Sequence, residues 1–288
     1  PDLVLCDVVM PSLDGLQLCR AIKRDVLLRA VPVILLSWKD DLLQRMRELG
    51  AGADGYMRKE SSASEILQRV NEVVRPRRIV GERIAAGGSV RGRLDGLTAP
   101  ALLKIICQAR PDSTLTLRDA NYAYEIQVRG GRPVMASRTH TGGATERGAQ
   151  VVAALLGVGA GRFGLVSTPE GQAFSAELEG TLEEQLLEPI ARIRAAQGLL
   201  SGHRLVRIER VILDERRMSV QLRATPEPSR GLLRALIAGV SPRELISAGR
   251  APADLVERVV CDAARQGAVL SVFGAQGHDL LPDAVERE

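Results

Sequence analysis

The first 74 residues alternate between apolar runs and amphipathic stretches, and this order constrains the fold more than any other feature of the chain. The runs LVLCDVV and VPVILLS are almost continuously apolar, which is typical of strands buried on both faces of a sheet. Between them, LQLCRAIKR places Leu18 and Ile22 four residues apart, on one face of a helix. A strand, a helix and a second strand in this order predict a parallel α/β sheet.

The same alternation continues to residue 74. A helix is expected from Asp40 to Leu49, where Gly50 provides a left-handed cap, and DGYMRK is expected to form a short third strand. Ser62 and Glu65 have the spacing of a capping box at the start of the helix SEILQRVNEVV. This order of strands and helices is that of the later part of a flavodoxin-like domain.

Polar residues stand at the ends of the three expected strands: Asp7, Ser37 and Lys59. An aspartate at the end of an apolar strand is often only a turn former, so Asp7 alone carries little information. The VVMP turn and the DG pair that follow Asp7, together with the later serine and lysine, resemble the receiver domain of two-component response regulators. The resemblance implies that Asp7 accepts a phosphoryl group from a histidine kinase or a phosphotransfer protein.

The resemblance also implies a role for each neighbouring residue. Lys59 would contact the phosphoryl oxygens as a point charge, and Ser37 would donate a hydroxyl hydrogen bond to the same group. Tyr56 matches the aromatic residue that swings inward in the switch of this family. Asp7 and the backbone carbonyl of Val9 would take part in binding Mg²⁺, the implied cofactor.

The sequence departs from the family pattern at two places. Glu60 follows Lys59 where receivers usually have a proline, which puts a carboxylate beside the phosphoryl site. The acidic pair that ends the first strand of a receiver and completes its Mg²⁺ site has no counterpart in the sequence. A β-α-β-α section of about 50 residues would lie ahead of Pro1, so we expect an N-terminally truncated receiver. As printed, the chain is expected to bind no Mg²⁺, to stay unphosphorylated at Asp7, and to expose the strand of Asp7 as an apolar edge.

The net charge of +4 over 288 residues is concentrated in one segment. Residues 71–93 carry six arginines and two glutamates, and we expect residues 75–93 to be a solvated, arginine-rich linker. Aromatic residues make up 2% of the chain, which leaves few platforms for stacking on single-stranded nucleic acid. The distribution of charge and aromatic residues therefore disfavours a nucleic-acid groove.

A different order, with a helix first and β-hairpins after it, begins near residue 94. TAPALLKIICQA has Thr98 as a candidate N-cap and Pro100 in the first turn. The strands YAYEIQVR and RPVMASR are joined by Gly130 and Gly131, a pattern typical of a tight hairpin. The opening helix, this hairpin and the closing strand RFGLVS resemble the PATAN-type domain over residues 94–168. That resemblance implies an interaction module without known catalysis, and thus an unidentified protein partner.

Residues 169–198 are expected to form an acidic helical segment. Thr181 and Glu184 have the spacing of a capping box, and Pro189 should kink the helix. An apolar stripe consists of Leu182, Leu186, Ile190 and Ile193. The stripe could bind a partner helix, although packing within its own domain is the commoner outcome.

Residues 199–288 contain three candidate helices, SRGLLRALIAG, SPRELISAG and PADLVERVVCDAARQG, followed by the strand AVLSVF. Three helices and a strand are similar to a winged helix, which makes a DNA-binding transcriptional regulator the alternative function. The candidate recognition helix carries three acidic and two basic residues: Asp254, Glu257, Asp262, Arg258 and Arg265. A recognition helix needs positive charge toward the phosphates, so this balance disfavours the alternative.

Other catalytic and metal sites find little support in the sequence. The four cysteines are far apart and lack nearby histidines, so reduced, buried thiols are expected. The glycines of LLGVGAGRF follow a helix and precede a strand, the reverse of the order that holds a phosphate. No apolar run approaches the ~20 residues that span a bilayer, and we expect a cytoplasmic protein that is not an enzyme.

The sequence thus predicts an α/β fold with an incomplete flavodoxin-like receiver over residues 1–74, then α+β domains with a winged-helix-like C-terminal part. The predicted function is a response regulator of a bacterial two-component phosphorelay, with output through protein interaction. The DNA-binding regulator is the alternative, and a scaffold with an inert receiver remnant is a third hypothesis.

Overall fold

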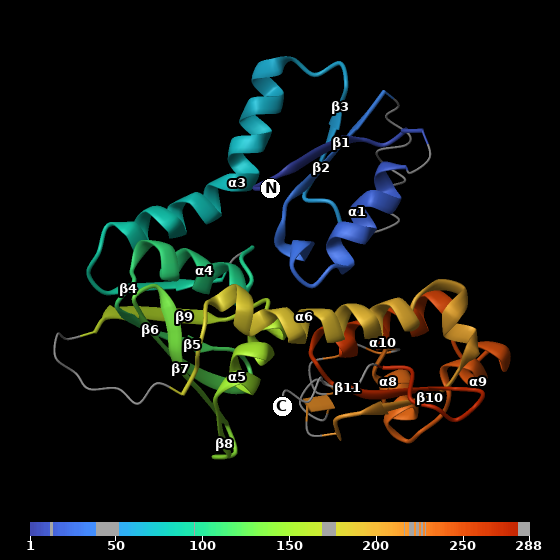
Figure 1. The fold of residues 1–288 in the computed structure, drawn as a ribbon. Helices are drawn as coiled ribbons and strands as arrows, with labels where there is room; N and C mark the ends of the chain where they lie inside the picture. Colours follow the sequence, from blue (N-terminus) through green and yellow to red (C-terminus); the bar gives the residue numbers. More distant parts are fainter. Residues whose placement is uncertain are drawn as a thin grey trace.

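The computed structural model describes residues 1–11, 14–38, 52–94, 96–168, 177–215, 217, 218, 222, 225, 227 and 229–281. These residues form three units, each with its own sheet and its own cluster of buried apolar side chains (Figure 1). The N-terminal unit lies above the other two in this view. Two long helices connect the units, namely α3 (Ala63–Ala85) and α6 (Leu182–Leu199).

The N-terminal unit is built on a parallel sheet with the order β1-β2-β3. Its strands are β1 (Val4–Asp7), β2 (Val33–Ser37) and β3 (Gly55–Arg58), which confirms the three strands expected from the sequence. α1 (Gly15–Arg24) buries Cys19 and Ile22 in one cluster with residues of β2, and the short helix η1 (Leu28–Ala30) follows it. The helix expected from Asp40 to Leu49 lies outside the described residues.

α3 begins at the predicted capping box and continues well past residue 74. The Ser62 N–H donates to Glu65 Oε2 at 2.7 Å, and the Glu65 N–H donates to Ser62 Oγ at 3.3 Å. The helix runs through Pro76, and β4 (Val90–Arg93) follows after a short turn. Residues 75–93 therefore form a helix and a strand where we expected a solvated linker.

Tertiary hydrogen bonds explain why this arginine-rich stretch has regular structure. Arg110 is 9% exposed and donates to three acceptors, the carbonyls of Ile84 at 3.4 Å and Gly88 at 3.2 Å and Ser167 Oγ at 2.5 Å. Arg77 of α3 donates to the Gly96 carbonyl at 3.0 Å. Pro76 removes one hydrogen bond from the helix, and these contacts from outside the helix offset that loss.

The middle unit is a six-stranded antiparallel sheet with the order β4-β9-β5-β6-β7-β8. Its further strands are β5 (Ser113–Arg118), β6 (Tyr122–Arg129), β7 (Arg132–His140), β8 (Thr145–Arg147) and β9 (Arg162–Ser167). The predicted hairpin between β6 and β7 is confirmed, and its two residues Gly130 and Gly131 have φ angles of 52° and 74°. Glycine adopts this left-handed conformation without the steric cost that a Cβ would add.

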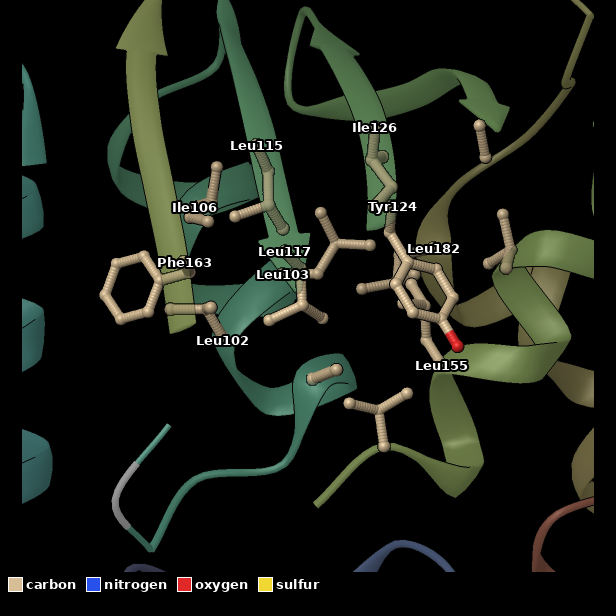
Figure 2. Close-up of a cluster of buried hydrophobic side chains, with 14 of the residues drawn as sticks. Leu102, Leu103, Ile106, Leu115, Leu117, Tyr124, Ile126, Leu155, Phe163 and Leu182 are labelled. Atoms are coloured by element: carbon tan, nitrogen blue, oxygen red, sulfur yellow. The ribbon is translucent and has the colours of Figure 1, made fainter. Parts of the chain in front are cut away.

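The core of the middle unit lies between this sheet and its helices α4 (Ala99–Ala109) and α5 (Ala149–Ala154) with the short helix η2 (Leu155–Gly157). Thr98 caps α4, as predicted, by accepting the Ala101 N–H at 3.4 Å. Figure 2 shows Leu102, Leu103 and Ile106 of α4 beside Leu115 and Leu117 of β5, all fully buried. The alternating buried and exposed positions of β5 are those of a strand with one face on the core. The relationship to the PATAN-type domain stays a prediction.

α6 contributes to two cores. Its buried side chains divide between the middle unit (Leu182, Leu186, Ile193) and the C-terminal unit (Ala196). The predicted capping box is confirmed, since the Thr181 N–H donates to Glu184 Oε2 at 2.7 Å. The described part of the segment expected as a separate acidic helix is therefore a connection that packs on both of its neighbours.

The described part of the C-terminal unit includes a two-stranded antiparallel sheet and the helices α8, α9 and α10. In chain order its elements are η3 (Gly202–Arg207), β10 (Ile208–Leu213), α8 (Ser229–Ile237), α9 (Pro242–Ser247), α10 (Ala253–Arg265) and β11 (Val269–Gly274). The three helices and the last strand were predicted, whereas β10 was missed because Glu209 and Arg210 interrupt its apolar pattern. The winged-helix relationship stays a prediction. Across the described ranges, no helix has both the length and the apolar character needed to cross a membrane.

We expect Arg110→Ala to lower the free energy of unfolding by about 2 kcal/mol, because its truncation leaves the buried Ile84 carbonyl without a donor and removes the hydrogen bonds to Gly88 and Ser167. Urea denaturation followed by circular dichroism measures this change. Arg91→Ala is the matched control, since Arg91 is exposed on β4, and its effect should stay under ~0.5 kcal/mol. Equal stability of the two variants would contradict the anchoring role of Arg110.

Candidate functional site

The three parallel strands end at one edge of the N-terminal sheet and bring predicted site residues to that edge. Asp7 is the last residue of β1, and its register partner on β2 is Leu36, next to Ser37. Ser37 pairs with Arg58 of β3, and the Lys59 N–H donates to the Ser37 carbonyl at 2.9 Å. Side chains that are far apart in the sequence therefore meet at the carboxyl ends of neighbouring strands.

Asp7 and Lys59 form an ion pair at this edge. Lys59 Nζ lies 2.5 Å from Asp7 Oδ2, and the lysine and aspartate side chains are 22% and 39% exposed. A carboxylate that solvent can reach is able to act as a nucleophile, and the adjacent ammonium group neutralises incoming oxygens. The arrangement therefore suits the transfer of an anionic group to Asp7.

Ser37 and Tyr56 lie on the strands next to Asp7. Ser37 is 4% exposed, at the end of the central strand β2. Tyr56 pairs in register with Leu35 of β2, and its half-buried side chain packs against the apolar cluster of the unit. The roles of Ser37 as a hydroxyl donor and of Tyr56 as a switch stay predictions.

The loop after β1 is held tightly against the start of α1. The Gly15 N–H donates to the Val8 carbonyl at 2.8 Å. A Cβ at position 15 would overlap the carbonyl oxygen of Asp7, so the glycine of the DG pair is needed for this close approach. Val9, whose carbonyl was predicted to bind Mg²⁺, is exposed in the same loop.

The described residues do not fit a magnesium cage. Among them, no group of three or more His, Cys, Asp or Glu side chains could hold a metal ion. Asp14, a carboxylate near Asp7 in sequence, instead caps α1 by accepting the Gln17 N–H at 2.7 Å. We therefore derive no step that depends on the metal.

Two neighbours of Lys59 shape the electrostatics of the site. Glu60, which stands where the family has a proline, forms an ion pair with Arg58 at 2.7 Å, and this pair compensates the Glu60 charge.

The second neighbour is aromatic. Lys59 Nζ also lies 5.5 Å from the centroid of the Trp38 ring, within range of a cation–π contact. Trp38 is 62% exposed. Its position directly after Ser37 was the signal that could have placed it beside the site.

The cysteines lie outside this constellation of polar groups. Cys19 and Cys261 are buried, and Cys6 and Cys107 are half-buried. Burial raises the pKa of all four thiols, to about 11 for Cys107. These thiols are therefore protonated and weakly nucleophilic near neutral pH, and the expected burial holds for Cys19 and Cys261 but only in part for Cys6 and Cys107.

The segment that carries this site is similar to a known protein family. Residues 1–71 match the family model described as "Response regulator receiver domain". Residues 1–71 belong to a response regulator receiver domain. The match includes Asp7, Ser37, Tyr56 and Lys59. The N-terminal unit is called the receiver below.

Curated relatives match between 26% and 36% of the chain. Response regulator PleD of Caulobacter vibrioides is 34% identical over 112 residues, which are 36% of this chain and 25% of PleD. The phosphate regulon transcriptional regulatory protein PhoB of Klebsiella pneumoniae is 37% identical over 75 residues, or 26% and 33% of the two chains. Histidine kinase P4 of Formosa agariphila is 34% identical over 77 residues, or 27% and 6%. The chain thus spans a third or less of the length of these relatives.

The receiver offers an internal test of whether the Asp7–Lys59 pair is functional or structural. A second pair of nearly equal exposure, Lys23 with Asp54, has an N–O distance of 2.7 Å, and Lys23 also donates to the Val31 carbonyl at 3.0 Å. We expect Lys59→Ala to change the free energy of unfolding by under ~1 kcal/mol, as is usual for a partly exposed pair. Lys23→Ala should cost about 1–2 kcal/mol, because a backbone acceptor also loses its donor.

Chemical denaturation of the two single variants measures the difference. A larger loss of stability for Lys59→Ala than for Lys23→Ala would contradict our interpretation, because it would make the Asp7–Lys59 pair a structural one.

Proposed function

We propose that this protein is a response regulator in which Asp7 accepts a phosphoryl group from a histidine kinase or a phosphotransfer protein. One observation carries the proposal, namely the 2.5 Å contact of Lys59 Nζ with Asp7 Oδ2 at the carboxyl edge of the parallel sheet. The contact lies within the segment that matches the receiver family. The relatives named response regulators and a histidine kinase support a phosphorelay context for this segment.

The proposed step is an in-line displacement at phosphorus. An Asp7 carboxylate oxygen forms a P–O bond while the P–N bond of the donor phosphohistidine breaks, and the departing imidazole nitrogen takes up a proton. Lys59 Nζ, which pairs with the free carboxylate, would turn to the phosphoryl oxygens as the charge moves onto them. The buried Ser37 hydroxyl at the end of β2 would donate a hydrogen bond to the same oxygens.

We further propose that the output is a protein interaction without catalysis, through the PATAN-like middle unit. The alternative of DNA binding would use α10 as a recognition helix. In the structure, Glu257 of α10 pairs with Arg24 of the receiver at 2.8 Å, and Asp254 pairs with Arg258 of the same helix at 3.5 Å. A helix that carries these carboxylates and contacts the receiver is poorly suited to approach DNA phosphates.

Phosphorylation of Asp7 tests the proposed function. Acetyl phosphate and Mg²⁺ are added to the printed chain and to its gene product with any residues encoded ahead of Pro1, and intact mass is measured. We expect a phosphoryl adduct on a form of the protein that carries an acidic pair ahead of Asp7, and none on its Asp7→Asn variant. The printed chain should stay unmodified, because it lacks the carboxylates that neutralise the incoming charge.

An unmodified gene product, or an adduct that persists in Asp7→Asn, would overturn the proposal. Modification of the printed chain at Asp7 would show that the acidic pair is dispensable, which contradicts the expectation drawn from the family pattern.

A further inference from the structure

The edge of the receiver opposite Asp7 packs on the junction between the middle and C-terminal units. We call residues 24–29, from the end of α1 to η1, the docking tip. Arg24 NH1 lies 2.8 Å from Glu257 Oε1 of α10, and the Arg24 carbonyl accepts from Gln197 Nε2 of α6 at 3.1 Å. The docking tip therefore contacts two helices of the other units.

The second residue of the docking tip is fixed from both sides. Asp25 Oδ1 accepts the Leu27 and Leu28 N–H groups at 2.9 and 3.0 Å, which closes the turn into η1. Asp25 Oδ2 accepts from Arg194 of α6 at 3.0 Å. One carboxylate thus holds the local backbone and an ion pair across the junction, which makes the position of the tip well defined.

A buried valine and a half-buried arginine complete the contact. Val26 is 2% exposed and belongs to the same apolar cluster as the core of the middle unit. Arg29 NH2 donates to the Leu156 carbonyl of η2 at 2.9 Å. Burial and the nearby Arg265 lower the pKa of Arg29 to about 10, so the guanidinium remains charged at neutral pH. The buried Val26 and the half-buried, hydrogen-bonded Arg29 distinguish this contact from a solvated surface contact.

α1 connects the docking tip directly to the phosphoacceptor edge. The helix begins at Gly15, which is packed against the carbonyl of Asp7, and ends at Arg24, the first residue of the tip. Ten residues of α-helix span about 15 Å and move as one body. A single helix thus joins the Asp7 loop to the opposite edge of the sheet (Figure 1).

We propose that the docking tip is the regulated contact of this protein: the free receiver is docked on α6, α10 and η2 through residues 24–29, and phosphorylation of Asp7 displaces α1 and loosens that contact. The proposal rests on the proposed phosphoacceptor function. The partner of the surface formed by α6, α10 and η2 is the receiver of the same chain, because the ion pairs and the buried Val26 already join the two.

A charge swap tests the docking. Hydrogen exchange is measured in peptides covering residues 26–31 and 155–159 of the full chain. Arg24→Glu and Glu257→Arg should each speed exchange by about tenfold, because each places like charges opposite one another. The double variant Arg24→Glu with Glu257→Arg should restore slow exchange. Arg20→Glu, exposed on α1 outside the tip, is the control.

Unchanged exchange in both single variants, or a double variant no slower than the singles, would overturn the docking. This readout needs no phosphoryl transfer. Docking without phosphorylation would therefore contradict the proposed function. Phosphorylation without docking would contradict this inference.

Gly15→Ala tests the transmission along α1. The added Cβ must displace the start of the helix from the Asp7 carbonyl, so exchange at residues 26–31 should rise although no docking residue changes. Retained slow exchange in β2 shows that the receiver stays folded. Faster exchange confined to residues 7–15 would overturn the transmission, and the charge swap decides the docking if this variant unfolds.

Discussion

The parallel direction of β1, β2 and β3 is the constraint on which the rest of this structure depends. Parallel strands give a sheet two unlike edges, because all carboxyl ends meet at one and all amino ends at the other. The carboxyl edge gathers Asp7, Ser37 and Lys59. The amino edge, where α1 ends, is left to contact the remainder of the chain. Chemistry and docking are thus separated by the length of one helix.

The two edges also differ in how their charges are compensated. At the carboxyl edge, the pair of Asp7 and Lys59 stays partly exposed to solvent. At the amino edge, charged groups are bound to backbone carbonyls and to other helices, as Arg29 is to the Leu156 carbonyl. The ion pairs at the amino edge are partly exposed as well, so its geometry depends on the hydrogen bonds to backbone carbonyls and on the buried Val26. The distribution suits a reactive edge joined to a structural one.

Local sequence signals predicted a large part of this fold. The capping boxes at Ser62 and Thr181 and the Gly130–Gly131 hairpin were correct, because their geometry depends on residues within four positions of one another. The sequence also assigned Asp7 and Lys59 to one site, because the residues at the strand ends resemble those of a known family, although it did not predict their direct ion pair. Elements stabilised by distant partners were not. α3 continues through Pro76 with support from Arg110, and β10 depends on pairing with β11.

The docking tip could not be predicted for the same reason. Arg24 and Glu257 are 233 positions apart, and nothing local to either residue indicates the other. The middle and C-terminal units share α6, so both of their surfaces are presented to the receiver together. The sequence patterns divide this region into separate segments. The shared helix α6 joins the two units into one surface that the receiver contacts.

The most direct test of this account compares hydrogen exchange of the gene product before and after phosphorylation of Asp7. The account predicts faster exchange at residues 24–31 and 155–159 in the phosphorylated protein, at the edge of the sheet away from the modified residue, with no change in the Asp7→Asn variant under the same conditions. Changes confined to the strand ends around Asp7 and Lys59 would contradict it, because the two edges of the sheet would then be uncoupled.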